Sequence, residues 1–265
     1  MPEGQLPEVV DLSFTIALDG GSVRSVFPVP AGQTTLTQIL PVIKEFTSGI
    51  ARHVSEVAAR NGKAVSCGPK CGACCRQLVP ISSFEAEDLA NWIRSLPADQ
   101  QSGIATRFQR ALLALQASGV LAQLNPAMFD LSRDEFKELG IAYFSAGVAC
   151  PFLVDESCSI HPIRPLVCRE YMVVSPPEYC AEPGHRRVDG VVLPLQSSRA
   201  MIQLGKRVEG DPQGWLPLVF LFHWMTAGLE AGSFVSGTGQ EVLQEFLEML
   251  TQQKSVNAAA VVGVV

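Results

Sequence analysis

CGPKCGACC, residues 67–75, places four thiols within nine residues, at Cys67, Cys71, Cys74 and Cys75. Its glycines and its proline let the backbone curl around one point, so that several sulfurs can be directed inward without helical or strand constraints. Thiolates are preferred ligands of zinc, iron–sulfur clusters and copper(I). The stretch therefore predicts a metal-binding loop around which the fold is organised.

A second group of cysteines lies in a proline-punctuated segment from Cys150 to Cys180, where we expect mostly irregular structure. Metal bonds offset the modest loop entropy that is lost when such a distant segment is brought to the first loop. We therefore predict that all the cysteines are metal ligands: Cys67, Cys71, Cys74, Cys75, Cys150, Cys158, Cys168 and Cys180.

The number of cysteine ligands alone does not identify the metal. Adjacent side chains such as those of Cys74 and Cys75 diverge, so we expect them to serve different roles or different metal atoms. Two zinc sites of four cysteines each would leave a local charge of about -4. A single [4Fe–4S] cluster needs only four thiolates and leaves the others for a second centre, for redox exchange or for hydrogen bonds to sulfides. Basic side chains that could compensate the negative charge are Lys70, Arg76, Arg164 and Arg169.

Composition limits the class of protein. The chain has 265 residues, is 47% hydrophobic and carries a formal net charge of -6, so it is long enough for a buried core and offers no basic field for nucleic acid. It shows neither a secretory signal pattern nor a stretch of about 20 apolar residues, so we expect a soluble, cytoplasmic protein that does not enter membranes. Cytosolic thiols stay reduced, which argues against disulfides as the role of the cysteines.

Hydrophobic periodicity predicts a mainly α fold (α+β). The alternation over residues 12–28 around Asp19-Gly20-Gly21 predicts a β-hairpin, and residues 35–60 predict one amphipathic helix that is kinked or restarted at Pro41. Further predicted helices follow Ser82 and Ser132, each with a glutamate three residues on. The remaining predictions are a helix over 104–115, a strand over 190–195, helices over 196–208, 216–231 and 240–253, and a tail over 256–265 that is disordered or packed on a neighbour.

The simplest organisation is a small helical domain with an N-terminal hairpin and an irregular cysteine-rich core. We assign residues 1–33 to the hairpin extension and residues 34–195 to a split cysteine-cluster domain. A helical insertion over 76–149 interrupts that domain, and the helices of residues 196–265 are expected to pack on it.

Taken together, CGPKCGACC at 67–75, CPFL at 150–153 and CSIHPIRPLVCREY at 158–171 resemble the YkgJ family of cysteine-cluster proteins, also called CxxCxxCC. The resemblance covers roughly residues 67–180 and falls on all eight cysteines and on Arg164 and Pro165. It implies a zinc- or iron-chelating domain. One branch similar to it, the flagellin lysine N-methylases, carries this cysteine pattern with an iron–sulfur cluster and S-adenosylmethionine.

Two features separate this chain from better-defined enzymes. It has no strand–GxGxG–helix fingerprint, since Gly237-Thr238-Gly239 lies between predicted helices. The spacing of Cys67, Cys71 and Cys74 also equals that of radical S-adenosylmethionine enzymes. In those enzymes, however, a strand of a β/α barrel precedes the motif, whereas a helix is predicted here.

Other side chains near the motifs could have either a functional or a purely structural role. Arg164 and Arg169 are candidates for binding an anionic cofactor or substrate or for donating to cluster sulfurs, and equally for charge compensation and loop anchoring. His161 is expected near the metal or on the surface rather than as a ligand. We expect Glu170 and Tyr171 on a solvated face. His223 and Trp224, on an apolar helix, are expected in the core.

Three hypotheses of function follow. The first is a protein that holds an iron–sulfur cluster, or zinc, through eight cysteines, with a redox role. The second is a cluster-dependent lysine N-methyltransferase that uses S-adenosylmethionine. The third is a structural zinc module for protein interactions. The partners implied are a metal ion or cluster and a protein substrate or redox partner; whether the chain is an enzyme is left open.

Overall fold

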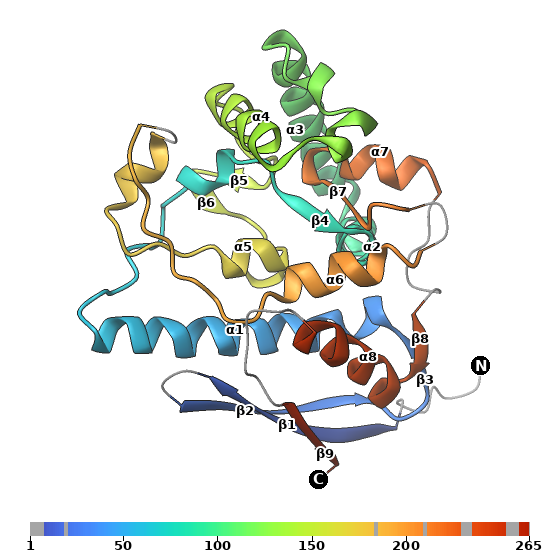
Figure 1. Ribbon diagram of the computed structural model, residues 1–265. Coiled ribbons are helices and arrows are strands. Elements are labelled where there is room, and N and C mark those ends of the chain that lie inside the picture. Colours follow the sequence, from blue (N-terminus) through green and yellow to red (C-terminus); the bar gives the residue numbers. More distant parts are fainter. Residues whose placement is uncertain are drawn as a thin grey trace.

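A long helix, α1 (Leu36–Arg60), crosses the molecule and lies between a small sheet and the other helices (Figure 1). It begins with a capping box between Thr35 and Gln38 and continues as one helix through Pro41. The prediction of a helix over 35–60 is therefore confirmed. The computed structural model describes residues 8–18, 21–182, 185–208, 211–228, 235–252 and 260–264.

A three-stranded antiparallel sheet covers one face of α1. Its order is β2 (Gly21–Pro30), β1 (Val9–Leu18), β9 (Ala260–Val264). Alternate residues of β1 are buried, and Phe14 meets Phe46 of α1 edge to face at a centroid distance of 4.9 Å. The predicted hairpin over 12–28 is confirmed, with Leu18 paired to Gly21; Asp19 and Gly20 lie outside the described residues.

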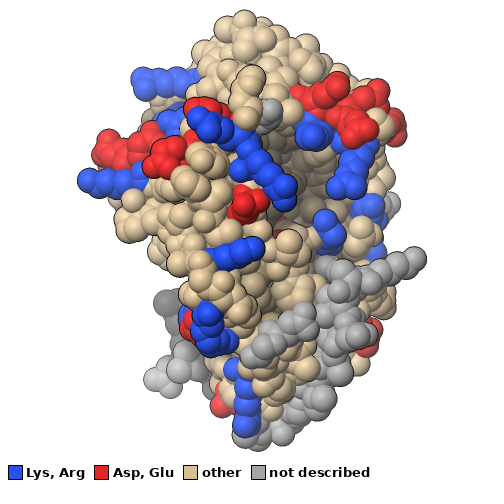
Figure 2. Space-filling view, turned by 60° about the vertical axis from the view of Figure 1, so that its left-hand side comes forward, with Lys and Arg blue, Asp and Glu red and all other residues tan. Residues whose placement is uncertain are grey.

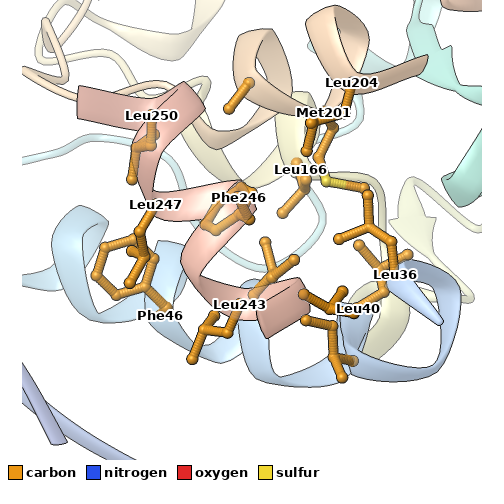
Figure 3. Packing of buried hydrophobic residues seen from close by; sticks show 14 of the residues in the cluster. Leu36, Leu40, Phe46, Leu166, Met201, Leu204, Leu243, Phe246, Leu247 and Leu250 are labelled. Carbon is orange, nitrogen blue, oxygen red and sulfur yellow. The ribbon is translucent and has the colours of Figure 1, made fainter. Parts of the chain in front are cut away.

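The largest hydrophobic cluster fills the space between the sheet, α1, α6 (Ser197–Gly205) and α8 (Gly239–Thr251). The start of α8 is fixed by its Thr238–Glu241 capping box and by pairing of β8 (Ser236–Thr238) with β3 (Gln33–Thr35). Burying each large apolar side chain stabilises the fold by about 1.5–3 kcal/mol. Figure 3 shows the side chains of α8 facing those of α1: Leu243, Phe246, Leu247 and Leu250 belong to α8, and Leu36, Leu40 and Phe46 belong to α1. Side chains from neighbouring helices lie above them, namely Leu166, Met201 and Leu204.

A second cluster backs the cysteine segments. Its centre is Phe152, which is fully buried and contacts Trp92 and Phe108 edge to face. The elements around it are β4 (Pro80–Ser82), which pairs with β7 (Trp215–Pro217), α2 (Ser83–Ser95), α3 (Ala98–Ala117), the 3₁₀ helix η6 (Leu218–Phe220) and α7 (Leu221–Thr226).

The third cluster joins the end of α3 to α4 (Arg133–Ser145) at the far end of the molecule from the sheet (Figure 1). Two short 3₁₀ helices, η2 (Leu121–Gln123) and η3 (Pro126–Asp130), connect them. The predicted capping boxes at Ser82 and Ser132 are both present, at the starts of α2 and α4. The fold is mainly α with some β, as predicted.

Three local predictions are wrong. Residues 190–195 form no strand beyond a single bridge between Gly190 and Val173, because Val192 is 86% exposed and Pro194 lacks an N–H. The helix expected over 216–231 is shorter: Pro217 belongs to β7, residues 218–226 form η6 and α7, and residues 229–231 lie outside the described residues. The tail is a strand over Ala260–Val264 that pairs with β1, and its other residues are not described.

No helix among the described residues combines the length and the apolarity that a membrane crossing requires.

Candidate metal centre

Direct bonds between backbone segments bring the two groups of cysteines together. The Cys150 N–H donates to the Cys75 carbonyl over 2.7 Å. Arg76 donates through both terminal nitrogens to the Glu156 carboxylate, at 3.0 and 2.7 Å. Ser66 donates its N–H to the Val173 carbonyl over 2.9 Å. The chain therefore joins these segments by its own hydrogen bonds.

The first cysteine loop owes its shape to tight turns. Lys70 has a positive φ of 64°, and the Cys71 N–H donates to the Gly68 carbonyl over 3.2 Å. The 3₁₀ helix η1 (Ala73–Arg76) follows and carries Cys74 and Cys75. A side chain at Gly72 would collide with the Glu156 carboxylate, so this glycine allows the two segments to approach each other.

The second segment begins with the smallest hairpin of the fold, β5 (Leu153–Val154) and β6 (Ser157–Cys158). Its two turn residues, Asp155 and Glu156, have φ values of 49° and 55°. A non-glycine residue in this region is strained by roughly 1–2 kcal/mol. The ion pair with Arg76 holds Glu156 in place, and the hairpin presents Cys158 to the first loop.

Cys168 and Cys180 are carried by short helices. The 3₁₀ helix η4 (His161–Ile163) leads through Arg164 and Pro165 into α5 (Leu166–Glu170), which carries Cys168. Cys180 lies on η5 (Pro177–Ala181), which packs against η1. Residues 150–180 are thus less irregular than expected, because these short helices and the two-residue strands make up about half of the range.

A cavity of about 630 Å³ opens between these segments. Figure 2, in which the left-hand side of Figure 1 comes forward, shows a hollow bordered by lysine and arginine side chains. Cys180 does not line the cavity; it is buried and hydrogen bonded to Tyr171, which does line it. The cysteines in the cavity wall are Cys67, Cys71, Cys74, Cys75, Cys150, Cys158 and Cys168.

All eight thiols are free, and Cys74 is at the centre of their interactions. Its pKa is lowered because it is hydrogen bonded to Cys75 and lies near the Arg164 guanidinium. The pKa of Cys75 is raised by the same hydrogen bond and by burial. Burial raises the pKa of Cys150 to about 12 and raises that of Cys168 as well. The pKa values of the two adjacent thiols are therefore shifted in opposite directions.

The thiols form two neighbourhoods that share Cys74. Cys67, Cys71 and Cys180 interact electrostatically with one another and with Cys74. The other neighbourhood consists of Cys75, Cys150, Cys158 and Cys168. Among the described residues, no three cysteine, histidine or carboxylate side chains converge closely enough to hold one metal ion. The thiols are distributed over the cavity wall.

The two candidate arginines differ in their surroundings. Arg169 is fully engaged in anchoring the loop before α5: Nε donates to the Arg164 carbonyl, and the terminal nitrogens donate to Pro162 and to Ser48 of α1. Arg164 lines the cavity, and its buried Nε has no hydrogen-bond partner among the described residues. Arg169 therefore anchors the loop, whereas Arg164 remains a candidate to contact a ligand in the cavity.

Two predictions about other residues near the site are wrong, those for Glu170 and His223. Glu170 is buried, not solvated, because it accepts hydrogen bonds from the N–H and hydroxyl of Ser198 at the start of α6, and burial raises its pKa to about 7. His223 is exposed, whereas Trp224 is in the core. Tyr171 is 37% exposed at the cavity. His161 is exposed and also lines the cavity, as expected.

The sequence indicates Arg76 as a charge-compensating residue but does not predict the contacts that join the two segments. Neither Arg76 with Glu156 nor the Ser66–Val173 bond belongs to a recognisable pattern. The sequence shows Gly72 to be a flexible residue of the loop. Its close approach to the Glu156 carboxylate could not be predicted, because that carboxylate is placed by a turn with two positive φ values. These contacts are properties of the folded backbone.

The fold and this cavity define a mainly α, cysteine-rich protein with a candidate metal centre. Residues 66–185 match the family model CxxCxxCC, described as "Putative zinc- or iron-chelating domain". This match lies on the segment that carries all eight cysteines and confirms the resemblance drawn from the motifs. No curated protein and no solved structure gives a significant match to the chain.

Proposed function

We propose that the chain holds a polynuclear iron–sulfur centre in the cysteine cavity. The observation that carries this proposal is the distribution of the thiols: seven line one cavity, yet no three of the described donors converge on a point. A tetrahedral zinc site needs four donors within about 2.3 Å of one ion, whereas a cluster takes each thiolate on a different iron atom. The arrangement of donors favours the cluster.

The proposed ligands come from all eight cysteines, with Cys180 completing the neighbourhood of Cys67 and Cys71. A bound cluster would supply one-electron redox chemistry, and a redox role is the function we favour. The chain's own residues would orient the thiolates through the turns of η1 and the β5–β6 hairpin. We place the protein in the reducing cytoplasm, because such an environment keeps the eight thiols free for metal.

The first experiment measures iron, zinc and acid-labile sulfide, with a visible spectrum, on protein purified without oxygen. About four irons and four sulfides per chain, with broad absorption near about 400 nm, would support a [4Fe–4S] cluster. One or two zinc ions without sulfide or colour would overturn it in favour of a structural zinc module. Cys74→Ser and Cys168→Ser should each lose metal; retention of full metal content by both would contradict a shared site.

The cavity itself favours a second candidate, an enzyme. Its volume of about 630 Å³ falls within the range of roughly 300–1,000 Å³ typical of small-molecule pockets. The hypothesis of a cluster-dependent lysine N-methyltransferase requires S-adenosylmethionine to bind next to the centre. Addition of S-adenosylmethionine to the anaerobic, cluster-loaded protein should then change its visible spectrum. An unchanged spectrum, with no binding by calorimetry, would remove this candidate.

A further inference from the structure

Arg164 is the exception to an otherwise consistent pattern of polar pairing. Its Nε is the one buried side-chain nitrogen or oxygen that has no hydrogen-bond partner within the described part of the chain. Leaving a buried donor unpaired destabilises a fold, and the cost is larger for a charged group. A strained site, a redox or catalytic role, or a bound water or ion can explain such a group in a folded protein.

The backbone holds Arg164 firmly in the cavity wall. Lys44 of α1 donates to the Ile163 carbonyl over 3.0 Å, just before Arg164. The Arg164 carbonyl accepts from Nε of Arg169 over 3.1 Å. Two residues further on, the Leu166 N–H donates to the buried carboxylate of Glu85 over 2.7 Å. The unpaired Nε is therefore not explained by a loose loop.

The surroundings of Arg164 indicate what its missing acceptor is. The guanidinium lines the same cavity as the thiols. The positive charge of Arg164 interacts with the thiols of Cys158 and Cys168. It also interacts with the Cys74 thiol. Arg164 therefore interacts with thiols of three separate elements, η1, β6 and α5.

We propose that Arg164 is the counter-cation of the metal centre, and that its Nε–H donates a hydrogen bond to a sulfur of that centre. This inference rests on the proposed function, because a cysteine-ligated centre must be present to supply the sulfur. Thiolate and sulfide sulfurs of such a centre carry negative charge, which a positively charged donor in the cavity wall would offset. Arg164 is a positioning and charge-compensating residue and is not assigned as a ligand.

The test compares Arg164→Met, Arg164→Lys and the control Arg187→Met, whose side chain is 93% exposed in the wild-type chain. Each protein is loaded without oxygen, in one series with iron and sulfide and in another with zinc. Metal affinity is measured by competition with a chelator, and the midpoint potential of the iron form is measured by redox titration. Urea unfolding of the metal-free proteins measures stability separately.

Arg164→Met should weaken metal affinity by about 10- to 100-fold, as losses of groups that orient metal ligands do. Its midpoint potential should become more negative, because the reduced centre loses a positive neighbour. Metal-free Arg164→Met should be at least as stable as the wild type, since an unpaired donor has been removed. Arg164→Lys should recover part of the affinity, and Arg187→Met should match the wild type.

Wild-type affinity and potential in Arg164→Met would overturn this inference while leaving the proposed function intact. A metal-free Arg164→Met that is strongly destabilised, with unchanged affinity once folded, would also overturn it by assigning Arg164 a structural role. Failure of Arg164→Lys to recover any affinity would contradict charge compensation. A wild-type chain that takes up neither iron nor zinc would overturn the proposed function and this inference together.

Discussion

At the scale of single residues, a few buried polar side chains attach the cysteine segments to the helices. Glu85 is 2% exposed and accepts from the Ser82 N–H over 2.9 Å and from the Leu166 N–H over 2.7 Å. The sequence predicts the first bond, which closes the capping box of α2. The second bond fixes the start of α5, and it could not be predicted because Leu166 is distant in the sequence.

Glu85→Ala is therefore expected to lower the free energy of unfolding by about 2–4 kcal/mol, because two buried N–H groups lose their acceptor. Urea denaturation followed by circular dichroism measures this loss. The matched control is Glu135→Ala in the exposed capping box of α4, where Glu135 accepts from the Ser132 N–H. That substitution should cost much less, because the Glu135 carboxylate is exposed to water. Equal costs for the two variants would contradict the double role of Glu85.

Lys44 is the second such residue. It is 6% exposed, and its ammonium contacts Asp88 of α2 at 2.6 Å and the Ile163 carbonyl at 3.0 Å. Lys44→Met should cost about 2 kcal/mol, since hydrogen bonds to charged groups contribute roughly 1.5–3 kcal/mol. Arg52→Met, which removes an exposed pair with Glu45 on the same helix, should cost less than about 0.5 kcal/mol in the same denaturation experiment. A larger loss in Arg52→Met would refute this ranking.

At the scale of elements, close backbone contacts decide where α6 meets the segment that leads into β7. Gly214 has a φ of +71°, and a Cβ there would lie 2.6 Å from the Lys206 nitrogen. Gly62, after the end of α1, has a nearly equal φ of +75° but no atom within 4 Å of such a Cβ. The two glycines share the conformation and differ in the space around them.

Gly214→Ala should therefore lower stability by about 1–3 kcal/mol more than Gly62→Ala, because crowding adds to the common cost of a positive φ. Thermal unfolding of both variants under identical conditions tests the difference. The crystal structure of Gly214→Ala should show the 211–214 turn displaced from α6. Equal unfolding temperatures would mean that the turn moves away without cost.

The elements also show which parts of the fold can be predicted from the sequence and why the other parts cannot. Helices with one apolar face and a capping residue, such as α1 and α4, could be predicted because both signals are local. The apolar run at 190–195 has the composition of a strand, but the fold offers it no partner beyond Val173. The thiols of the site could be identified from their spacing, whereas the orphaned Nε of Arg164 could not, because burial is set by distant segments.

At the scale of the whole molecule, the segment that matches the family and the main core are largely separate. Among the described residues of the largest hydrophobic cluster, only Phe84 and Leu166 come from 66–185. The cysteine cavity is held by hydrogen bonds and by the smaller second cluster. Stabilisation by a bound metal should therefore be local.

Metal loading should slow amide hydrogen exchange over residues 66–80 and 150–181 and leave β1, β2 and α8 nearly unchanged. Binding at 100 times the dissociation constant adds about 2.7 kcal/mol to the stability of the unit that holds the metal. Exchange measured by mass spectrometry on metal-free and loaded protein resolves these segments. Uniform slowing throughout the chain would show instead that the two halves unfold as one unit.

The pairing of β4 with β7 has a consequence for the order in which the protein is made. Ile81 lies opposite Leu216, and Leu218 and Trp224 help to form the cluster behind the cysteines. The segment with all eight thiols leaves the ribosome before this support does. We expect the nascent chain to expose its thiols during that interval, so that the timing of translation sets when a metal can be inserted and how long the sulfurs are open to oxidation.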